Sequence, residues 1–342
     1  GYSLDRIIGP ETFLQGVEGA SDSRRLAVLM LCGLVAGCGW WLIYRFGRPL
    51  ISVTQAVQDP AARMPAKTTL AHALLQIITV GLGSPLGREV APREVGALAA
   101  SGVSAWLRLP ADQHRLIVAC GAGAGLAAVY NVPLGAALFV LEVLLGTFAW
   151  PAAAVALVTC CIGAVIAWIG LGNEIQYAVP PMTAGASLIV WAAVAGPLFG
   201  IAAQGFVQLT SAARRQAARG WRLPVAAFVN FTLIGVLAIF LPALLGNGKG
   251  PAQLGFSSEL TLGMAALLLV LKVAITSGSL RAGASGGLLT PGIAIGALLA
   301  VVLGAAWNLI WPNAPPGAYA VVGAAAFPVS YTHLTLPTTP YV

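Results

Sequence analysis

The sequence has 342 residues, of which 58% are hydrophobic and 8% are charged, and its formal net charge is +7. Soluble domains carry about 25% charged residues, so this composition excludes a soluble globular protein and indicates an integral membrane protein. The excess of lysine and arginine predicts basic cytoplasmic loops and no nucleic-acid partner, because these residues are enriched in the cytoplasmic loops of membrane proteins.

In chain order, residues 1–23 are expected to form an N-terminal remnant and loop. A bilayer crossing takes about 20 apolar residues, and the sequence offers four such stretches, at 26–46, 150–171, 184–207 and 223–245. Shorter apolar pieces, most of them bounded closely by Gly, Pro or Ser, lie at 68–82, 94–107, 114–129, 133–148, 260–276, 291–309 and 319–327. Interrupted helices of this kind are typical of transporters and channels, since irregular backbone inside a membrane must be buried or line a cavity.

Three further features bound the organisation of the chain. A basic cluster at 214–222 lies between apolar stretches and predicts a cytoplasmic loop that sets the topology. The five cysteines fall in apolar segments and the three histidines are scattered, so no metal site and no cofactor is expected. Residues 330–342 break the Ala/Gly/Leu/Val texture, and we interpret them as a non-native or mis-joined tail.

Two motifs divide the remaining chain into related halves. GREVAP (87–92) precedes a Gly/Ala-rich segment that begins at Gly121, and GGLLTP (286–291) precedes a similar one that begins at Gly323. We therefore expect an all-α membrane protein, a multi-helix bundle with two inverted-topology halves at 24–179 and 180–329 and with broken, tilted helices. The functional site is expected at the interface between the halves.

Both motifs stand directly before apolar helices, which gives them a specific chemistry. The first turn of a helix has N–H groups without intrahelical partners, and the helix dipole adds about half a positive charge there. Two such ends inside a membrane make an anion site without any lysine. Glu89 would occupy the place of the anion when none is bound; alternatively, it complements the dipole of its own helix and pairs with Arg88 or Arg93.

At these motifs the sequence resembles the CLC family of chloride channels and proton-coupled chloride transporters. Gly87-Arg88-Glu89 matches the Gly-Arg-Glu of the family, residues 121–143 resemble its Gly-rich segment with the Tyr-Asn-x-Pro-Leu turn, and residues 283–299 resemble its second anion loop. The resemblance covers about residues 24–327 and implies a homodimer in a bacterial inner membrane, with one chloride pore per subunit.

The resemblance also implies roles for individual residues. Glu89 corresponds to the gating glutamate, and the backbone amides of Leu288 and Leu289 correspond to those that hold the anion. Gly287, Arg88 and Val90 flank these positions and are expected to belong to the anion-binding site with them. The alternative for the two leucines is that they are ordinary apolar residues at a helix start.

The sequence departs from the family at three places that bear on the anion path. Val90-Ala91 stand where the family has Gly-Pro, and valine does not easily take the backbone angles of glycine. The serine of the first anion loop has no secure counterpart; Ser52 is the substitute, or else the cap of the next helix. The central tyrosine is missing, since Tyr331 lies in the suspected tail.

One departure bears on mechanism. Val143 occupies the position of the inner glutamate that relays protons in the coupled members, and the neighbouring Glu142 would project about 100° away around a helix. This favours a passive, voltage-gated chloride channel, with a chloride/proton antiporter as the alternative. An intramembrane enzyme would need a paired catalytic set, which the long spans do not offer.

Overall fold

The computed structural model describes residues 13–59, 61–173, 175–312 and 314–334. Within these ranges the regular structure is helical, apart from one isolated bridge between two glycines. The all-α prediction is therefore confirmed. The elements are α2 (Phe13–Glu18), α3 (Asp22–Phe46), α4 (Val53–Gln58), α5 (Ala66–Gly81), α6 (Val90–Trp106), α7 (Ala111–Tyr130), α8 (Pro133–Phe139), η1 (Val140–Leu145), α9 (Trp150–Leu171), α10 (Ala186–Arg215), α11 (Arg222–Phe240), η2 (Pro242–Leu244), α12 (Lys249–Phe256), α13 (Leu262–Arg281), α14 (Leu289–Trp307) and α15 (Pro316–Leu334).

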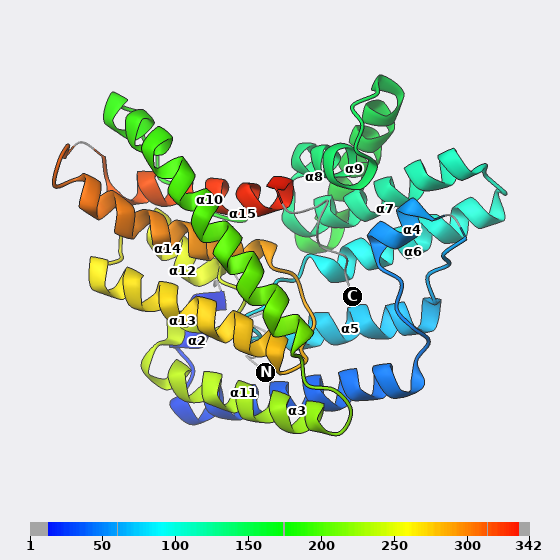
Figure 1. The fold of residues 1–342 in the computed structure, drawn as a ribbon, viewed down its shortest axis with the longest axis horizontal. Helices are drawn as coiled ribbons and strands as arrows, with labels where there is room; N and C mark the ends of the chain where they lie inside the picture. Colours follow the sequence, from blue (N-terminus) through cyan, green and yellow to red (C-terminus); the bar gives the residue numbers. More distant parts are fainter. Residues whose placement is uncertain (1–12, 60, 174, 313, 335–342) are drawn as a thin grey trace.

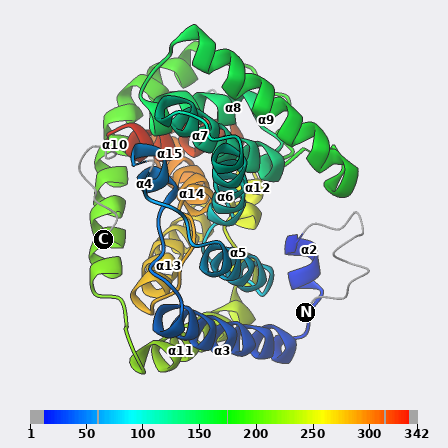
Figure 2. The same ribbon diagram turned by 90° about the vertical axis from the view of Figure 1, so that its right-hand side faces the viewer.

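Helices α4 to α7 and helices α12 to α15 occupy opposite sides of the molecule. In Figure 1, α4 to α7 lie on the right and α12 to α15 on the left, while α3 and α11 run side by side along the bottom and α10 crosses the front. Figure 2 shows α6 and α14 between α9 at the top and the α3–α11 pair at the bottom. The short loops before α6 and α14 consequently meet inside the protein.

The two halves repeat with a spacing of 200 residues. Gly83 and Gly283 both have positive φ, at 103° and 91°, each two residues after the last residue of α5 and α13 respectively. Glycine is the residue that adopts this conformation without strain, so the two turns share one backbone requirement. This register pairs Pro291 with Ala91, whereas the sequence analysis paired Pro291 with Pro92. That pairing was off by one because several positions of a first helical turn tolerate proline.

Matching glycines also set the packing within each half. A Cβ atom at Gly96 would overlap the carbonyl of Gly121 where α6 crosses α7. A Cβ atom at Gly296 would overlap the carbonyl of Gly323 where α14 crosses α15. Small residues let helix backbones approach closely, as is typical of membrane helix pairs. The Gly/Ala-rich segments noted in the sequence therefore serve the same contact in both halves.

Six helices in the described part of the chain are long and apolar enough to cross a membrane: α3, α9, α10, α11, α13 and α14. The prediction that 260–276 and 291–309 are short pieces was wrong, because α13 has 20 residues and α14 has 19. The predicted piece ended at Thr276 because Ser277, Gly278 and Ser279 follow it, but these residues continue the helix to Arg281. The protein is a multi-pass membrane protein.

The last helix continues into the segment interpreted as a tail. α15 extends to Leu334, so the change of composition at Ser330 does not coincide with a helix end. The Tyr331 hydroxyl donates to the carbonyl of Leu288 at 2.9 Å. The origin of residues 330–342 stays a prediction, and residues 1–12 and 335–342 lie outside the described ranges.

Candidate anion site between two helix N-termini

Backbone segments from the two halves meet at Gly87 and Gly287. Each N–H of this antiparallel bridge donates to the C=O of the other glycine, with N···O distances of 2.8 and 3.0 Å. α6 begins at Val90 and α14 at Leu289, so the bridge holds both helix N-termini together. Unpaired first-turn donors and the positive ends of two helix dipoles therefore converge at one place inside the protein.

The carboxylate of Glu89 lies at this point of convergence. Glu89 is 2% exposed, and although it is the N-cap residue of α6, its side chain does not cap its own helix. Instead, Oε1 accepts from the backbone N–H of Leu289 at 2.7 Å, and Oε2 accepts from the Tyr130 hydroxyl at 3.1 Å. A negatively charged group thus sits at the N-terminus of the facing helix, which is where an anion binds most favourably.

The two bridging glycines leave the space that the carboxylate fills. A Cβ atom built at Gly87 or at Gly287 would overlap the carboxyl oxygens of Glu89. The N–H of Gly287 donates within the bridge, so this glycine shapes the site, and its own amide is engaged elsewhere. Leu288 is the N-cap residue of α14, and the amide of Leu289 is the one that binds the carboxylate.

Tyr130 and Thr290 belong to the site and were missed by the sequence analysis. Tyr130 ends α7 and is 9% exposed, and its hydroxyl contacts both Glu89 Oε2 and the Thr290 hydroxyl. Because an ionised carboxylate only accepts hydrogen bonds, Tyr130 donates to Glu89 and Thr290 donates to Tyr130. The tyrosine of the Tyr-Asn-x-Pro-Leu turn was the available signal, since Asn131 turns the chain with φ of 57° directly after it.

Arg88 supplies positive charge near the site without touching the carboxylate through a described contact. Its Nη2 donates to Gln176 Oε1 at 2.9 Å and to the Val129 carbonyl at 3.4 Å. Its guanidinium carbon lies 5.8 Å from the centre of the Tyr130 ring. Arg88 therefore stands behind the tyrosine that holds Glu89, and it pairs with the connection between the halves.

That connection, residues 172–185, lies against the second half close to the site. The Tyr177 ring packs against Phe256 with centroids 5.4 Å apart, and Ala178 exchanges two hydrogen bonds with the Gln253 side chain. Burial raises the pKa of Tyr177 to about 12, with Glu89 adding to the rise and Arg88 opposing it. The hydroxyl of Tyr177 is therefore neutral at physiological pH.

Val90 does not need the backbone freedom of glycine. It is the first residue of α6, and it is not among the described non-glycine residues with positive φ. The expectation of a backbone conflict at this position was wrong, because a helical first turn accepts any L-residue. Nearby, Arg93 Nε donates to the Glu89 carbonyl at 3.0 Å, and its guanidinium lies over the Phe139 ring.

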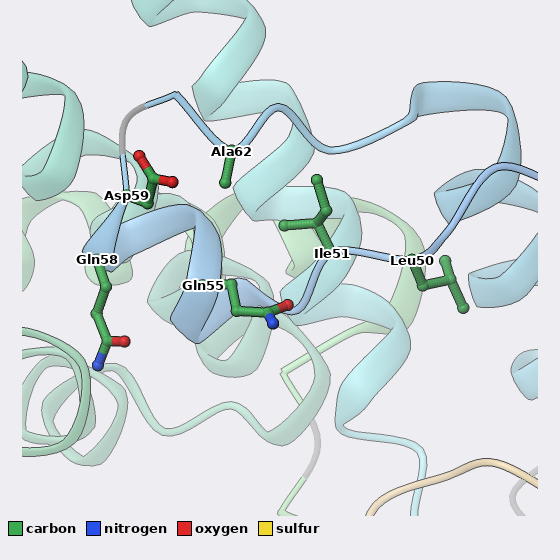
Figure 3. Close-up of a pocket in the computed structure, with 6 residues that line it drawn as sticks. All are labelled: Leu50, Ile51, Gln55, Gln58, Asp59 and Ala62. Carbon is green, nitrogen blue, oxygen red and sulfur yellow. The ribbon is translucent and has the colours of Figure 1, made fainter. Parts of the chain in front are cut away.

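Ser52 is the N-cap of α4, which was the alternative to its role as an anion ligand. The Gln55 N–H donates to Ser52 Oγ at 3.2 Å and the Ser52 N–H donates to Gln55 Oε1 at 2.9 Å, forming a capping box. Ile51 and Leu289 both pack against the apolar cluster of the first half. A cavity of about 290 Å³ beside it (Figure 3) is lined by Leu50, Ile51, Gln55, Gln58, Asp59 and Ala62.

Val143 lies in the π-helical segment η1 and packs against the apolar cluster of the first half. Glu142 is exposed in the same segment. At the position where the resemblance implies an inner proton carrier, this chain thus has an apolar side chain that packs against its neighbours. Among the residues that the structure describes, no three His, Cys, Asp or Glu side chains gather as a metal site.

Comparison with known proteins agrees with this geometry. The family model described as "Voltage gated chloride channel" matches residues 26–340. A "Putative chloride channel protein ClcB-like" of Ralstonia nicotianae is 30% identical over 317 residues, which cover 90% of this chain and 73% of the relative. A "Voltage-gated ClC-type chloride channel ClcB" of Citrobacter koseri is 29% identical over 345 residues, covering 93% and 78%.

Solved structures share the fold. A slow cyanobacterial Cl⁻/H⁺ antiporter matches with a TM-score of 0.75 at 19% identity, covering 91% of this chain and 80% of that one. A CLC-type fluoride/proton antiporter matches with a TM-score of 0.68 at 22% identity, covering 96% and 94%. From the matched family and the paired helix starts at Gly87 and Gly287, the chain belongs to the voltage gated chloride channel (CLC) family.

Proposed function

We propose that this protein moves chloride across the membrane along a path that the carboxylate of Glu89 opens and closes. One observation carries the proposal: Glu89 Oε1 accepts a hydrogen bond of 2.7 Å from the first amide of α14. A tethered anion occupies a helix N-terminus, and a free anion of similar size can take its place. This position, called the anion seat below, is formed by the Leu289 N–H and the Tyr130 hydroxyl. Both are neutral donors, and the positive ends of the α6 and α14 dipoles lie beside them.

These donors suit a small anion that must also leave. The Leu289 N–H and the Tyr130 O–H point at the carboxylate, and both belong to neutral groups. Neutral donors replace part of the hydration shell of a halide without the tight hold of a buried lysine or arginine. Conduction requires binding of this intermediate strength, favourable enough to admit the ion and weak enough to release it.

Protonation provides the gating step. The hydrogen bonds to Glu89 are charge-assisted while the carboxylate is ionised, and such bonds weaken by about half when the charge is removed. A neutral Glu89 side chain therefore leaves the seat more readily, and chloride enters it. Because the proton that neutralises Glu89 moves through part of the membrane field, opening also depends on voltage.

The inner position favours passive conduction. The Val143 side chain has no titratable group and cannot bind a proton. In addition, the curated relatives are named as channels. The second candidate is chloride/proton exchange, which is favoured by the names of the structural neighbours. Flux without a proton gradient separates the two candidates.

The same proposal includes assembly and location. The most apolar span, α9, buries only 17% of its window within the subunit, which leaves an apolar surface for lipid or a second copy. A homodimer with one path per subunit accounts for this surface. The named relatives are bacterial, and we place the protein in the bacterial inner membrane.

Reconstitution into liposomes tests the function. Chloride-loaded vesicles should release chloride under a potassium/valinomycin potential at equal pH on both sides, and the reversal potential should not move with a pH gradient. Glu89→Gln should raise the flux at pH 7 at least tenfold and remove its pH dependence, because the neutral amide cannot hold the seat as an anion. The control is Glu142→Gln, which changes an exposed glutamate and should behave as the native chain. An unchanged flux and pH dependence in Glu89→Gln would show that Glu89 is not the gate.

A further inference from the structure

A second buried acid lies on α6, one turn beyond the gate, and the anion seat does not use it. Glu94 Oε2 lies 2.9 Å from Nδ1 of His72 and 3.3 Å from Nε2 of Gln76. His72 and Gln76 are 4% and 1% exposed and lie on α5, whereas the Glu94 side chain keeps 12% exposure. A histidine and a glutamate thus share a hydrogen bond inside the protein, and the glutamate keeps a small exposed surface.

The arrangement of the heavy atoms requires a shared proton. Either His72 Nδ1 donates to the Glu94 carboxylate, or a protonated Glu94 donates to Nδ1. Gln76 Nε2 also lies 2.9 Å from His72 Nδ1, so Gln76 contacts both members of the pair.

The His72–Glu94 pair lies between Glu89 and the side of the membrane that carries the basic loops. The Arg48 N–H donates to the Thr68 hydroxyl at 3.1 Å, so α3 ends where α5 begins. The far end of α6 returns to the same side, since Arg63, Ala66 and Arg108 line one cavity of about 610 Å³. Basic loops face the cytoplasm, and His72, in the second turn of α5, is therefore nearer the cytoplasmic end of that helix than the end that leads to Gly87.

Other charged groups surround the pair on this side. Tyr44 lies two residues before the end of α3, and Arg214 lies one residue before the end of α10. An Arg214 Nη2 donates to the Gly286 carbonyl at 3.3 Å, directly before the bridging glycine of the second half. On α5 itself, Lys67 is exposed one turn before His72. Lys67 thus places a basic group on the cytoplasmic side of His72.

The second half carries different chemistry at the same place. Lys272 lies 200 residues after His72 and is fully buried, and its ammonium donates to the carbonyls of Leu244 and Gly246. The lysine is occupied by backbone acceptors, whereas His72 has an acidic partner. The repeat therefore places an acid–imidazole pair on one side of the seat only.

We propose that His72 and Glu94 form a proton-binding site that supplies Glu89 with its neutralising proton from the cytoplasmic side. The proposal rests on the gate assigned to Glu89 and explains how a proton reaches it although position 143 is apolar. Glu94 follows Glu89 by five residues, about 7.5 Å of rise along α6. When the proton passes, the pair loses one positive charge and Glu89 gains one, so the carboxylate leaves the seat. Proton supply to the gate is compatible with passive anion flow.

Planar bilayers with independently controlled pH on the two sides test the proposal. Acidifying the cytoplasmic side of the full chain should activate chloride current, and Glu94→Gln and His72→Gln should each reduce this activation at least tenfold. Activation from the opposite side and the chloride/nitrate selectivity should stay unchanged. The matched control is His114→Gln, since His114 Nδ1 is bonded to the Ser104 hydroxyl at 2.9 Å and has no acidic partner.

The outcomes separate this inference from the gate itself. If Glu89→Gln abolishes the pH response while Glu94→Gln and His72→Gln keep it in full, the pair is not the proton supply and the gate stands. If Glu89→Gln keeps the native response, the gate assignment falls. Glu94→Asp retains a carboxylate and should restore part of the cytoplasmic response. This rescue distinguishes proton binding from a purely structural role, and a Glu94→Asp variant that behaves like Glu94→Gln would contradict the proposal.

Discussion

The loops before α6 and before α14 share a backbone and differ in charge. Both contain a positive-φ glycine at the end of a helix, and both donate to and accept from each other at Gly87 and Gly287. The first loop adds Arg88 and Glu89, whereas the second adds Leu288 and Leu289. One half therefore offers a charged side chain, and the other offers the helix amide that receives it. The comparison teaches that a symmetric frame can produce a gate when its two sides carry different side chains.

The largest effect on chloride flux is expected when a side chain fills the space between the two loops. Gly287→Ala places a Cβ atom where the Glu89 carboxyl stands, and the overlapping atoms are the far end of a flexible side chain, which can move away. We expect the fold to survive and the gate to be displaced, so that chloride flux at pH 7 rises at least tenfold. Liposome efflux together with thermal unfolding checks this. Gly102→Ala, in open space on α6, is the control, and a Gly287→Ala variant that stays closed would contradict the proposed position of the gate.

Removing one donor from the seat should sharpen the comparison with a smaller effect. Tyr130→Phe keeps the ring beside Arg88 and deletes the hydroxyl that donates to Glu89 at 3.1 Å. A hydrogen bond to a charged group contributes about 1.5–3 kcal/mol, and its loss favours the neutral form of the gate. The midpoint of acid activation should therefore move to higher pH by about one unit or more. Current recorded against pH measures the shift, and Tyr177→Phe should leave the midpoint between pH 5 and 9 unchanged, since that hydroxyl titrates near pH 12.

The smallest effect is expected at the start of α4, which lies outside the two loops. Ser52→Ala removes the side chain that accepts from the Gln55 N–H. Loss of an N-cap costs about 1 kcal/mol of stability, so the unfolding temperature should fall slightly while anion selectivity and flux remain native. A change of selectivity in this variant would restore Ser52 as an anion ligand.

The sequence could predict those parts of the site that are specified by a single short motif. Glu89 and the two loops stood out because charge, glycine and proline are local signals in an apolar chain. Tyr130 and Thr290 were missed because their roles arise only when the end of α7 reaches the start of α14. The sequence analysis aligned Pro92 with Pro291, which shifted the repeat by one residue. The glycines at 83 and 283 define the correct register, because both adopt a positive φ. The length of α13 was underestimated because Ser277, Gly278 and Ser279 resemble a helix end, although they lie within the helix.

The mutual hydrogen bonds of Gly87 and Gly287 tie the two repeats at their contact, and Ala178 and Gln253 add a second tie. Rocking one repeat against the other would rupture all four of these bonds at once. A barrier that consists of a single carboxylate needs no such rupture, since only a few torsions of Glu89 have to change. With the gate proposed for Glu89, ion passage needs only side-chain rotation on a stationary scaffold, and crosslinking the repeats to each other should leave it intact.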